Sequence, residues 1–269
     1  MHLMEQKIAF PKGLRANKRL GQNFLMDEGV AELEAKYGEG RNVLELGSGL
    51  GVLTRQLCKT ARSVLSVEKD RRLYYMLSES LHCPNLSLVN ADFFELGEAQ
   101  LHGVDIMISN VPYMLSSRII EWLISRKLEA VLCLQKEFVE RMLATVGSRK
   151  YSRLSVMSTL LLEVESIAEV KAELFYPKPR VDSEIIHIKP LVREISEEEA
   201  SLIKLLMEHK KKKLRNAVID SSSQLGISKE QARELADSFS NSEERVFKIA
   251  PEDLLLSARR LAKSLRLLK

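Results

Sequence analysis

The chain has 269 residues, of which 45% are hydrophobic and 29% charged, a composition typical of a globular protein with one large and one small domain. No apolar run is long enough to span a bilayer, and the N-terminus shows no secretory signal pattern. We therefore expect a cytoplasmic protein that does not contact membranes, and we also expect a monomer. The three cysteines are far apart and form no CxxC pair or His/Cys cluster, which argues against a metal site and favours buried, reduced thiols.

The net charge of +4 is unevenly distributed along the chain. Residues 1–27 hold five basic and two acidic side chains, and residues 210–215 read Lys-Lys-Lys-Lys-Leu-Arg. A solvated helix face is the ordinary explanation for such runs. Two concentrated basic patches in a nearly balanced chain nevertheless favour a nucleic-acid partner. The candidate phosphate contacts are Lys18, Arg19, Lys210, Lys211, Lys212, Lys213 and Arg215.

The first part of the chain predicts a polar arm, a helix and then a strand that runs into a glycine-rich turn. The arm, residues 18–25, is basic and contains glycine, and its last two residues, Phe24 and Leu25, should dock on the protein. A helix is expected from about Asp27 to Tyr37. The strand Asn42–Leu46 then enters Glu-Leu-Gly-Ser-Gly-Leu-Gly. Glycines there let the backbone turn sharply and approach a ligand, and the GxGxG spacing differs from the GxGxxG of nicotinamide cofactor sites.

The next two predicted strands end in acidic residues. Glu68 follows Ser63–Val67 and lies 21 residues after Gly47, a distance at which an acid can accept both hydroxyls of a ribose. Its alternative role is that of an acid at the start of a helix. Asp92 follows the strand Leu86–Val89 and either accepts from an adenine amino group or caps a turn. Successive strands that end in such residues indicate a ligand site at one edge of the sheet.

The segment around which we expect the site to be organised is Ser109–Tyr113, between a buried strand and a helix. Asn110 supplies an acceptor, Pro112 stiffens the turn, and Tyr113 offers a flat face on which a base can stack. An ordinary turn is the alternative. In a doubly wound sheet of order 3-2-1-4-5, the first and fourth strands are neighbours. Gly47 and Asn110 should therefore lie side by side.

The remainder of the chain predicts a fifth strand at Ala130–Leu134, two further strands, and a helical C-terminal region. Residues 147–153 form a basic loop with one aromatic, either a solvated connection or a second RNA contact. The proline-rich loop that begins at Phe175 cannot be a helix or a central strand. Phe175 is held there either against a ligand or as a core aromatic. After Pro190, capped helices are expected to begin at Ser196 and Ser228 and a last helix follows.

Together these motifs closely resemble the KsgA/Dim family of ribosomal RNA adenine dimethyltransferases over nearly the whole chain. The arm and the Asn-Val-Pro-Tyr turn are specific to that family, whereas the glycine loop alone would mark any class I methyltransferase. The link Glu34–Arg41 and the loop after Phe175 are more similar to the archaeal members. The matching segments are Lys-Arg-Leu-Gly-Gln-Asn-Phe-Leu, Glu-Leu-Gly-Ser-Gly-Leu-Gly, Glu68, Asp92, Asn-Val-Pro-Tyr, Phe-Tyr-Pro-Lys-Pro-Arg-Val-Asp, and Lys-Leu-Arg-Asn at 213–216.

The resemblance implies an α/β fold with a class I, Rossmann-like methyltransferase domain at residues 1–190, including the basic arm, and a helical rRNA-binding domain at 191–269. It implies S-adenosylmethionine as donor and N6,N6-dimethylation of two adjacent adenosines in the 3′-terminal hairpin of 16S (small-subunit) rRNA, in a 30S pre-ribosomal particle. By motif, the cofactor site would include Gln22, Asn23, Leu25, Gly47, Gly49, Glu68, Asp92 and Asn110. The catalytic group would be Asn110, Pro112, Tyr113 and Phe175.

The expected chemistry requires placement rather than a strong base. N6 of adenine is a weak nucleophile that loses its proton after attack, so acceptors at Asn110 and at the Val111 or Pro112 carbonyl would orient it. Tyr113 would stack on the extruded base, with Phe175 on its other face. The alternatives are an adenine-N6 methyltransferase that acts on another RNA or DNA and a mainly non-catalytic ribosome assembly factor. A complete glycine loop together with Glu68 and Asn110 argues against a purely binding role, although both roles can coexist.

Overall fold

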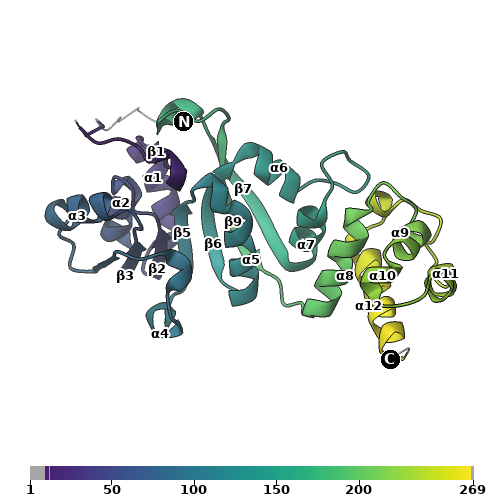
Figure 1. The fold of residues 1–269 in the computed structure, drawn as a ribbon. Coiled ribbons are helices and arrows are strands. Elements are labelled where there is room, and N and C mark those ends of the chain that lie inside the picture. The colour runs from purple at the N-terminus through teal and green to yellow at the C-terminus, as the bar shows by residue number, and fades with distance from the viewer. Residues whose placement is uncertain (1–9, 12, 268–269) are drawn as a thin grey trace. The chain divides into compact units, whose positions relative to one another are not determined.

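The structure, a computed structural model, describes residues 10–11 and 13–267. Of the basic N-terminal stretch at residues 1–27, residues 1–9 and Lys12 lie outside the described residues. The chain folds into two compact units (Figure 1). The first combines residues up to Val139 with Val164–Pro190, and the second combines Glu140–Glu163 with residues from Leu191 onward. The second unit therefore takes in residues 140–163, which the sequence had assigned to the methyltransferase domain.

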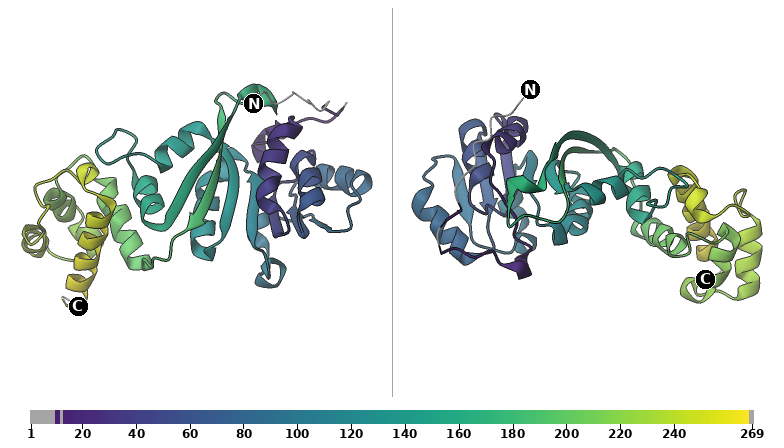
Figure 2. Two further views of the ribbon diagram at one scale, coloured as in Figure 1. Left: turned by 180° about the vertical axis from the view of Figure 1, so that it is seen from behind. Right: turned by 90° about the horizontal axis from the view of Figure 1, so that it is seen from above.

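A seven-stranded sheet has the strand order β4-β3-β2-β5-β6-β9-β7. Its first five members pair in parallel, and β9 runs antiparallel to β6. The predicted order of the first five strands is thus confirmed. Strands β9 and β7, the last two in that order, are long and lie side by side at one end of the sheet (Figure 2). The bounds are β2 (Asn42–Leu46), β3 (Ser63–Val67), β4 (Leu86–Val89), β5 (Ile106–Asn110), β6 (Glu129–Gln135), β7 (Leu162–Val170) and β9 (Ser183–Pro190).

Apolar residues run almost without interruption through the middle strands, because helices cover both faces of a parallel sheet. In β5 and β6 every residue except those at the strand ends is buried. Helix α1 packs against α2 beside them. The helices of this unit are α1 (Glu28–Ala35), α2 (Val52–Thr60), α3 (Arg71–Ser80), α4 (Glu98–Leu101) and α5 (Ser116–Arg126). Helix α6 (Lys136–Met142) begins in this unit and ends in the second one.

The arm is docked by a short antiparallel pair of strands. Strand β1 (Phe24–Leu25) pairs with β8 (Phe175–Tyr176), and both residues of β1 are buried. Phe10 adds an aromatic contact, with its ring centroid 4.2 Å from that of Tyr176. The prediction that the arm docks through its last two residues is therefore confirmed.

The second unit is helical, and two of its helices begin at the predicted caps. Ser196 and Ser228 each form a capping box with the residue three positions later. Tyr151 is fully buried here, and its hydroxyl donates to Ile249 O at 3.1 Å. The aromatic of the predicted basic loop is therefore a core residue rather than an RNA contact. The helices are α7 (Arg153–Leu161), α8 (Glu197–Glu208), α9 (Leu214–Asp220), α10 (Ser222–Leu225), α11 (Lys229–Asp237) and α12 (Pro251–Leu267).

Within residues 10–11 and 13–267, no helix is both long and apolar enough to cross a membrane, and no group of His, Cys, Asp and Glu residues could hold a metal ion. All three cysteines are free thiols. Cys133 is buried as expected, whereas Cys58 and Cys83 are partly exposed.

Candidate active site

The carboxyl ends of β2 and β5 lie next to each other and are joined by a side-chain hydrogen bond. The two strands form ladder pairs only in their first halves. Further along, the buried Ser109 hydroxyl donates to Leu46 O at 2.6 Å. Gly47 follows Leu46 and Asn110 follows Ser109, so the glycine turn and the Asn-Val-Pro-Tyr turn are neighbours. This is the arrangement expected at the switch point of strand order.

Both turns line one cavity in the first unit, with a volume of about 300 Å³. Ligand pockets commonly start at about this size. The cavity also takes lining residues from the arm, from the ends of β3 and β4, and from β8. It brings together these predicted residues: Arg19, Gln22, Asn23, Leu25, Gly47, Gly49, Glu68, Asp92, Asn110, Pro112, Tyr113 and Phe175.

The glycine turn leaves the cavity floor open to a ligand. Gly47 has a φ of +78°, and a Cβ there would meet nothing within 4 Å. Gly49 has a φ of +57°, and a Cβ there would lie 3.2 Å from the Phe24 ring. The first glycine is thus needed for backbone conformation, and the second also for the close approach of the arm.

The buried carboxyl group of Glu45 stabilises the glycine turn through hydrogen bonds. Glu45 is 1% exposed and accepts hydrogen bonds from Thr54 Oγ1 at 2.8 Å and from Ser66 Oγ at 2.5 Å. Burial raises the pKa of Glu45 to about 7, although the two hydroxyl donors oppose that rise. Because the three residues come from β2, α2 and β3, their bonds hold the turn against both neighbouring elements.

Glu68, at the end of β3, has the position and free acceptor capacity for hydroxyl groups. Its Oε2 accepts from Gly49 N at 2.9 Å and its Oε1 from Asp70 N at 2.7 Å. Burial raises the pKa of Glu68, and these backbone donors oppose the rise. The side chain that caps α3 is Asp70, which accepts from Arg72 N, so Glu68 does not serve as the helix cap. Each carboxylate oxygen retains a lone pair for a ligand.

Asp92 performs the turn-capping role that the sequence left as an alternative, and it lines the cavity as well. Its Oδ1 accepts from Phe94 N at 3.1 Å, and its Oδ2 pairs with Lys69 Nζ at 2.6 Å. The bond to Lys69 is the main cause that lowers the pKa of Asp92. The carboxylate is therefore fixed in place and ionised at neutral pH.

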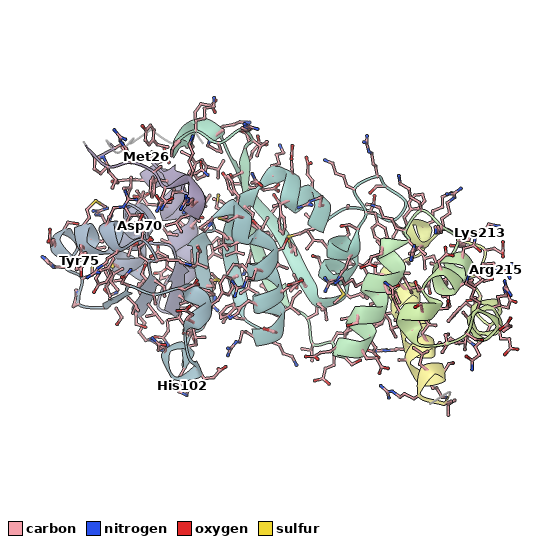
Figure 3. The ribbon with its side chains drawn as sticks, viewed as in Figure 1. Met26, Asp70, Tyr75, His102, Lys213 and Arg215 are labelled. Atoms are coloured by element: carbon pink, nitrogen blue, oxygen red, sulfur yellow. The ribbon has the colours of Figure 1, made fainter. Side chains whose placement is uncertain are left out.

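The arm is tied to the start of α3 through Asp70, a residue that the sequence did not single out and that Figure 3 labels. Gln22 Nε2 donates to Asp70 Oδ2 at 2.9 Å, and Gln22 Oε1 accepts from Asn17 N at 2.7 Å. Arg72 pairs with the same Asp70 oxygen at 2.6 Å and lowers the pKa of Asp70 to about 2. An ionised Asp70 thus fastens one wall of the cavity.

The Asn-Val-Pro-Tyr turn is anchored through two side chains from other parts of the fold. Asn110 Nδ2 donates to Glu34 Oε2 at 3.1 Å, while Asn110 Oδ1 is buried and has no hydrogen-bond partner in the described chain. The Tyr113 hydroxyl lies 2.7 Å from Ser183 Oγ. Burial raises the pKa of Tyr113 to about 12, so its phenol is neutral. An amide acceptor and an aromatic ring are therefore held at fixed places beside the glycine turn.

Phe175 is both a core aromatic and a residue that lines the cavity, which are the two alternatives that the sequence left open. It is 5% exposed within the hydrophobic core and also lines the cavity. In the β1–β8 pair it lies opposite Leu25. The arm and the proline-rich loop therefore form one wall.

The basic run at 210–215, of which Figure 3 labels Lys213 and Arg215, is largely engaged in contacts within the second unit. Lys210 Nζ donates to a backbone carbonyl, and Lys212, Lys213 and Arg215 each pair with an acidic side chain. Lys211 is exposed and forms no ion pair with any residue in the described part of the chain. Lys18 and Arg19 are exposed in a short 3₁₀ turn of the arm. The run is thus not a uniform patch of free charge.

These features define a class I, Rossmann-like methyltransferase fold with a helical C-terminal region. The family model described as ribosomal RNA adenine dimethylase matches residues 13–263. The chain belongs to this family, as the resemblance in its sequence implied.

Similar proteins agree with this assignment. A probable ribosomal RNA small subunit methyltransferase A from Thermococcus kodakarensis is 38% identical, over 92% of this chain and 91% of its own. The protein of the same name from Methanopyrus kandleri is also 38% identical, over 90% and 86%. Among solved structures, a dimethyladenosine transferase from Plasmodium falciparum has a TM-score of 0.70 at 27% identity and covers 88% of this chain and 95% of its own. The 23S rRNA methyltransferase ErmE has a TM-score of 0.61 at 26% identity, with coverages of 89% and 99%.

Proposed function

We propose that this protein, as a cytoplasmic monomer, transfers methyl groups from S-adenosylmethionine to N6 of two adjacent adenosines in the 3′-terminal hairpin of small-subunit rRNA. The substrate would be the rRNA of a 30S pre-ribosomal particle. Family membership and the names of the relatives support this class of substrate. The observation that carries the chemistry is the shared cavity of the glycine turn and Asn110, whose strands are joined by the Ser109–Leu46 hydrogen bond.

The cavity residues suit S-adenosylmethionine. Glu68 would bind the ribose hydroxyls with its remaining lone pairs, and Asp92 would accept from the adenine amino group. Gly47 leaves room for the donor at the strand end. When bound, S-adenosylmethionine supplies an electrophilic methyl group on a sulfonium. The remaining cofactor contacts would be Gln22, Asn23, Leu25, Gly49 and Asn110.

Asn110 would act by orienting the target amine. Its Oδ1 and the carbonyl of Val111 or Pro112 would accept the two N6 hydrogens and so direct the nitrogen lone pair at the methyl group. Attack on the methyl group makes the nitrogen cationic and acidic, so it then releases one proton to water for each methyl that it gains and requires no strongly basic side chain. Tyr113, fixed by Ser183, would stack on the extruded adenine, and Phe175 would limit its other face.

RNA affinity would come from basic residues of both units. Lys18, Arg19 and Lys211 are exposed and would bind phosphates directly. The paired members of the run would have to exchange acidic partners for phosphate oxygens, which reduces their net contribution. The other candidate contacts are Lys210, Lys212, Lys213 and Arg215.

The test is methyl transfer from labelled S-adenosylmethionine to unmodified small ribosomal subunits, with mapping of the modified residues. Asn110→Ala should keep rRNA binding and lower the transfer rate by about a hundredfold or more, the usual cost of removing one such acceptor or donor. Gln224→Ala removes an exposed amide from the second unit and serves as the control. Full activity in Asn110→Ala would exclude the acceptor role. Label that maps outside the 3′-terminal hairpin, or no label with the wild type, would exclude the proposed substrate.

A further inference from the structure

Beside the Asn-Val-Pro-Tyr turn, one carboxyl group is completely buried and has a single hydrogen-bond partner among the described residues. Glu34, on α1, is 0% exposed. Its Oε2 accepts from Asn110 Nδ2 at 3.1 Å, whereas its Oε1 has no hydrogen-bond partner in the described chain. Buried polar atoms without partners are rare in proteins and call for an explanation. An apolar side chain at position 34 would avoid the cost of burying a polar oxygen without a partner, so stability alone does not account for a glutamate.

We propose that Glu34 is a positioning residue that determines which end of the Asn110 amide is available to a ligand in the cavity. The inference rests on the proposed function, in which Asn110 must present an acceptor. An asparagine amide has a donor at one end and an acceptor at the other. A carboxylate can only accept, so ionised Glu34 binds Nδ2 and leaves Oδ1 as the free end.

Neutral Glu34 loses this selectivity. A protonated carboxyl group can donate as well as accept. It can therefore bind the Asn110 amide in either orientation, and the reversed orientation presents Nδ2 to the cavity. That nitrogen is a donor and would repel an amine hydrogen. A population with the wrong end available would reduce the fraction of molecules able to orient adenine N6.

The charge state of Glu34 changes near neutral pH. Burial raises its pKa to about 8; the hydrogen bond from Asn110 lowers it, and the nearby Glu45 carboxylate raises it. The titratable groups that face Glu34 are Glu45 on β2 and the Cys133 thiol on β6, whose own pKa is well above its usual value because of burial. Glu34 is ionised above about pH 8. Its control of the Asn110 amide should therefore strengthen as the pH rises through that value.

The test compares wild type with Glu34→Gln, which keeps the shape of the side chain and cannot ionise. Glu32→Gln makes the same change at an exposed position of the same helix and is the matched control. The first readout needs no substrate: the ¹⁵N–¹H side-chain amide signals of Asn110, identified by their loss in Asn110→Ala. These signals should shift with a midpoint near pH 8 in wild type and Glu32→Gln, and should not titrate there in Glu34→Gln.

The second readout is the pH dependence of methyl transfer. In wild type, kcat should rise through about pH 8, whereas in Glu34→Gln it should be lower by roughly twofold to tenfold at high pH and lack that limb. The KM for S-adenosylmethionine should not change. Asn110 signals and a rate profile that are the same in Glu34→Gln and wild type would overturn the inference. Absence of adenosine methylation by the wild type would instead refute the proposed function, and the amide signals would still report on Glu34.

Discussion

The hydrogen bond from Ser109 to Leu46 should hold the two halves of the site together. Ser109 is fully buried, and its hydroxyl reaches the Leu46 carbonyl at 2.6 Å at a point where the β2–β5 ladder has already ended. Ser109→Ala would leave that buried carbonyl without this donor, at a cost of about 1–3 kcal/mol. A loss of about 2 kcal/mol corresponds to a fall in Tm of roughly 4–8 °C. Because the bond joins the residues before Gly47 and Asn110, the gap between the two turns should also widen.

A widened gap should affect catalysis more than stability. Displacement of reacting groups by about 1 Å can lower a rate about a hundredfold, so we expect kcat in Ser109→Ala to fall by about tenfold or more. The assays are thermal unfolding and single-turnover methyl transfer. Ser125→Ala removes an exposed hydroxyl that bonds within α5 and should change stability by less than about 0.5 kcal/mol. If Ser109→Ala unfolds and turns over like Ser125→Ala, the bond does not hold the site.

Two further substitutions test the arm and the basic run. Asp70→Ser keeps a cap for α3 but is too short to hold Gln22, so it should raise the KM for S-adenosylmethionine by about tenfold, the equivalent of about 1.4 kcal/mol, with little change in kcat. An unchanged KM would show that the arm does not need its hydrogen bond to Asp70. Lys211→Ala should lower the slope of log K against log salt for rRNA binding by about 1, and more than Lys212→Ala does, because Lys212 is already paired with Asp220; equal slopes in the two variants would contradict that ranking.

The strand order and the main site motifs could be predicted from the sequence because their signals are local. Each of the first five strands is a short apolar run, and the residues that follow the runs are glycines, acids or an amide. Alternation of strands with helices then fixes a parallel sheet and brings the strand ends to one edge. The capped helices at Ser196 and Ser228 were predictable for the same reason, since a capping box is contained within four residues.

The features that were missed depend on partners far away in the sequence. Glu34 and Asn110 are 76 residues apart, and Gln22 and Asp70 are 48 residues apart. Helix α7 is buried on several sides, with Ser155, Val156 and Leu160 all enclosed, so it lacks the single apolar stripe that predicts a surface helix. The acids that pair with Lys213 and Arg215 are likewise distant, 30 and 22 residues along the chain, and a charge count along the chain could not reveal these pairs.

The pairing of β1 with β8 has a consequence for the order of events during synthesis. Leu25 lies opposite Phe175, so the wall that they share cannot form while only the first half of the polypeptide has left the ribosome. Domains generally fold as units, and this unit includes residues up to Pro190. The wall that β1 and β8 share can therefore be completed only after the proline-rich loop has been translated.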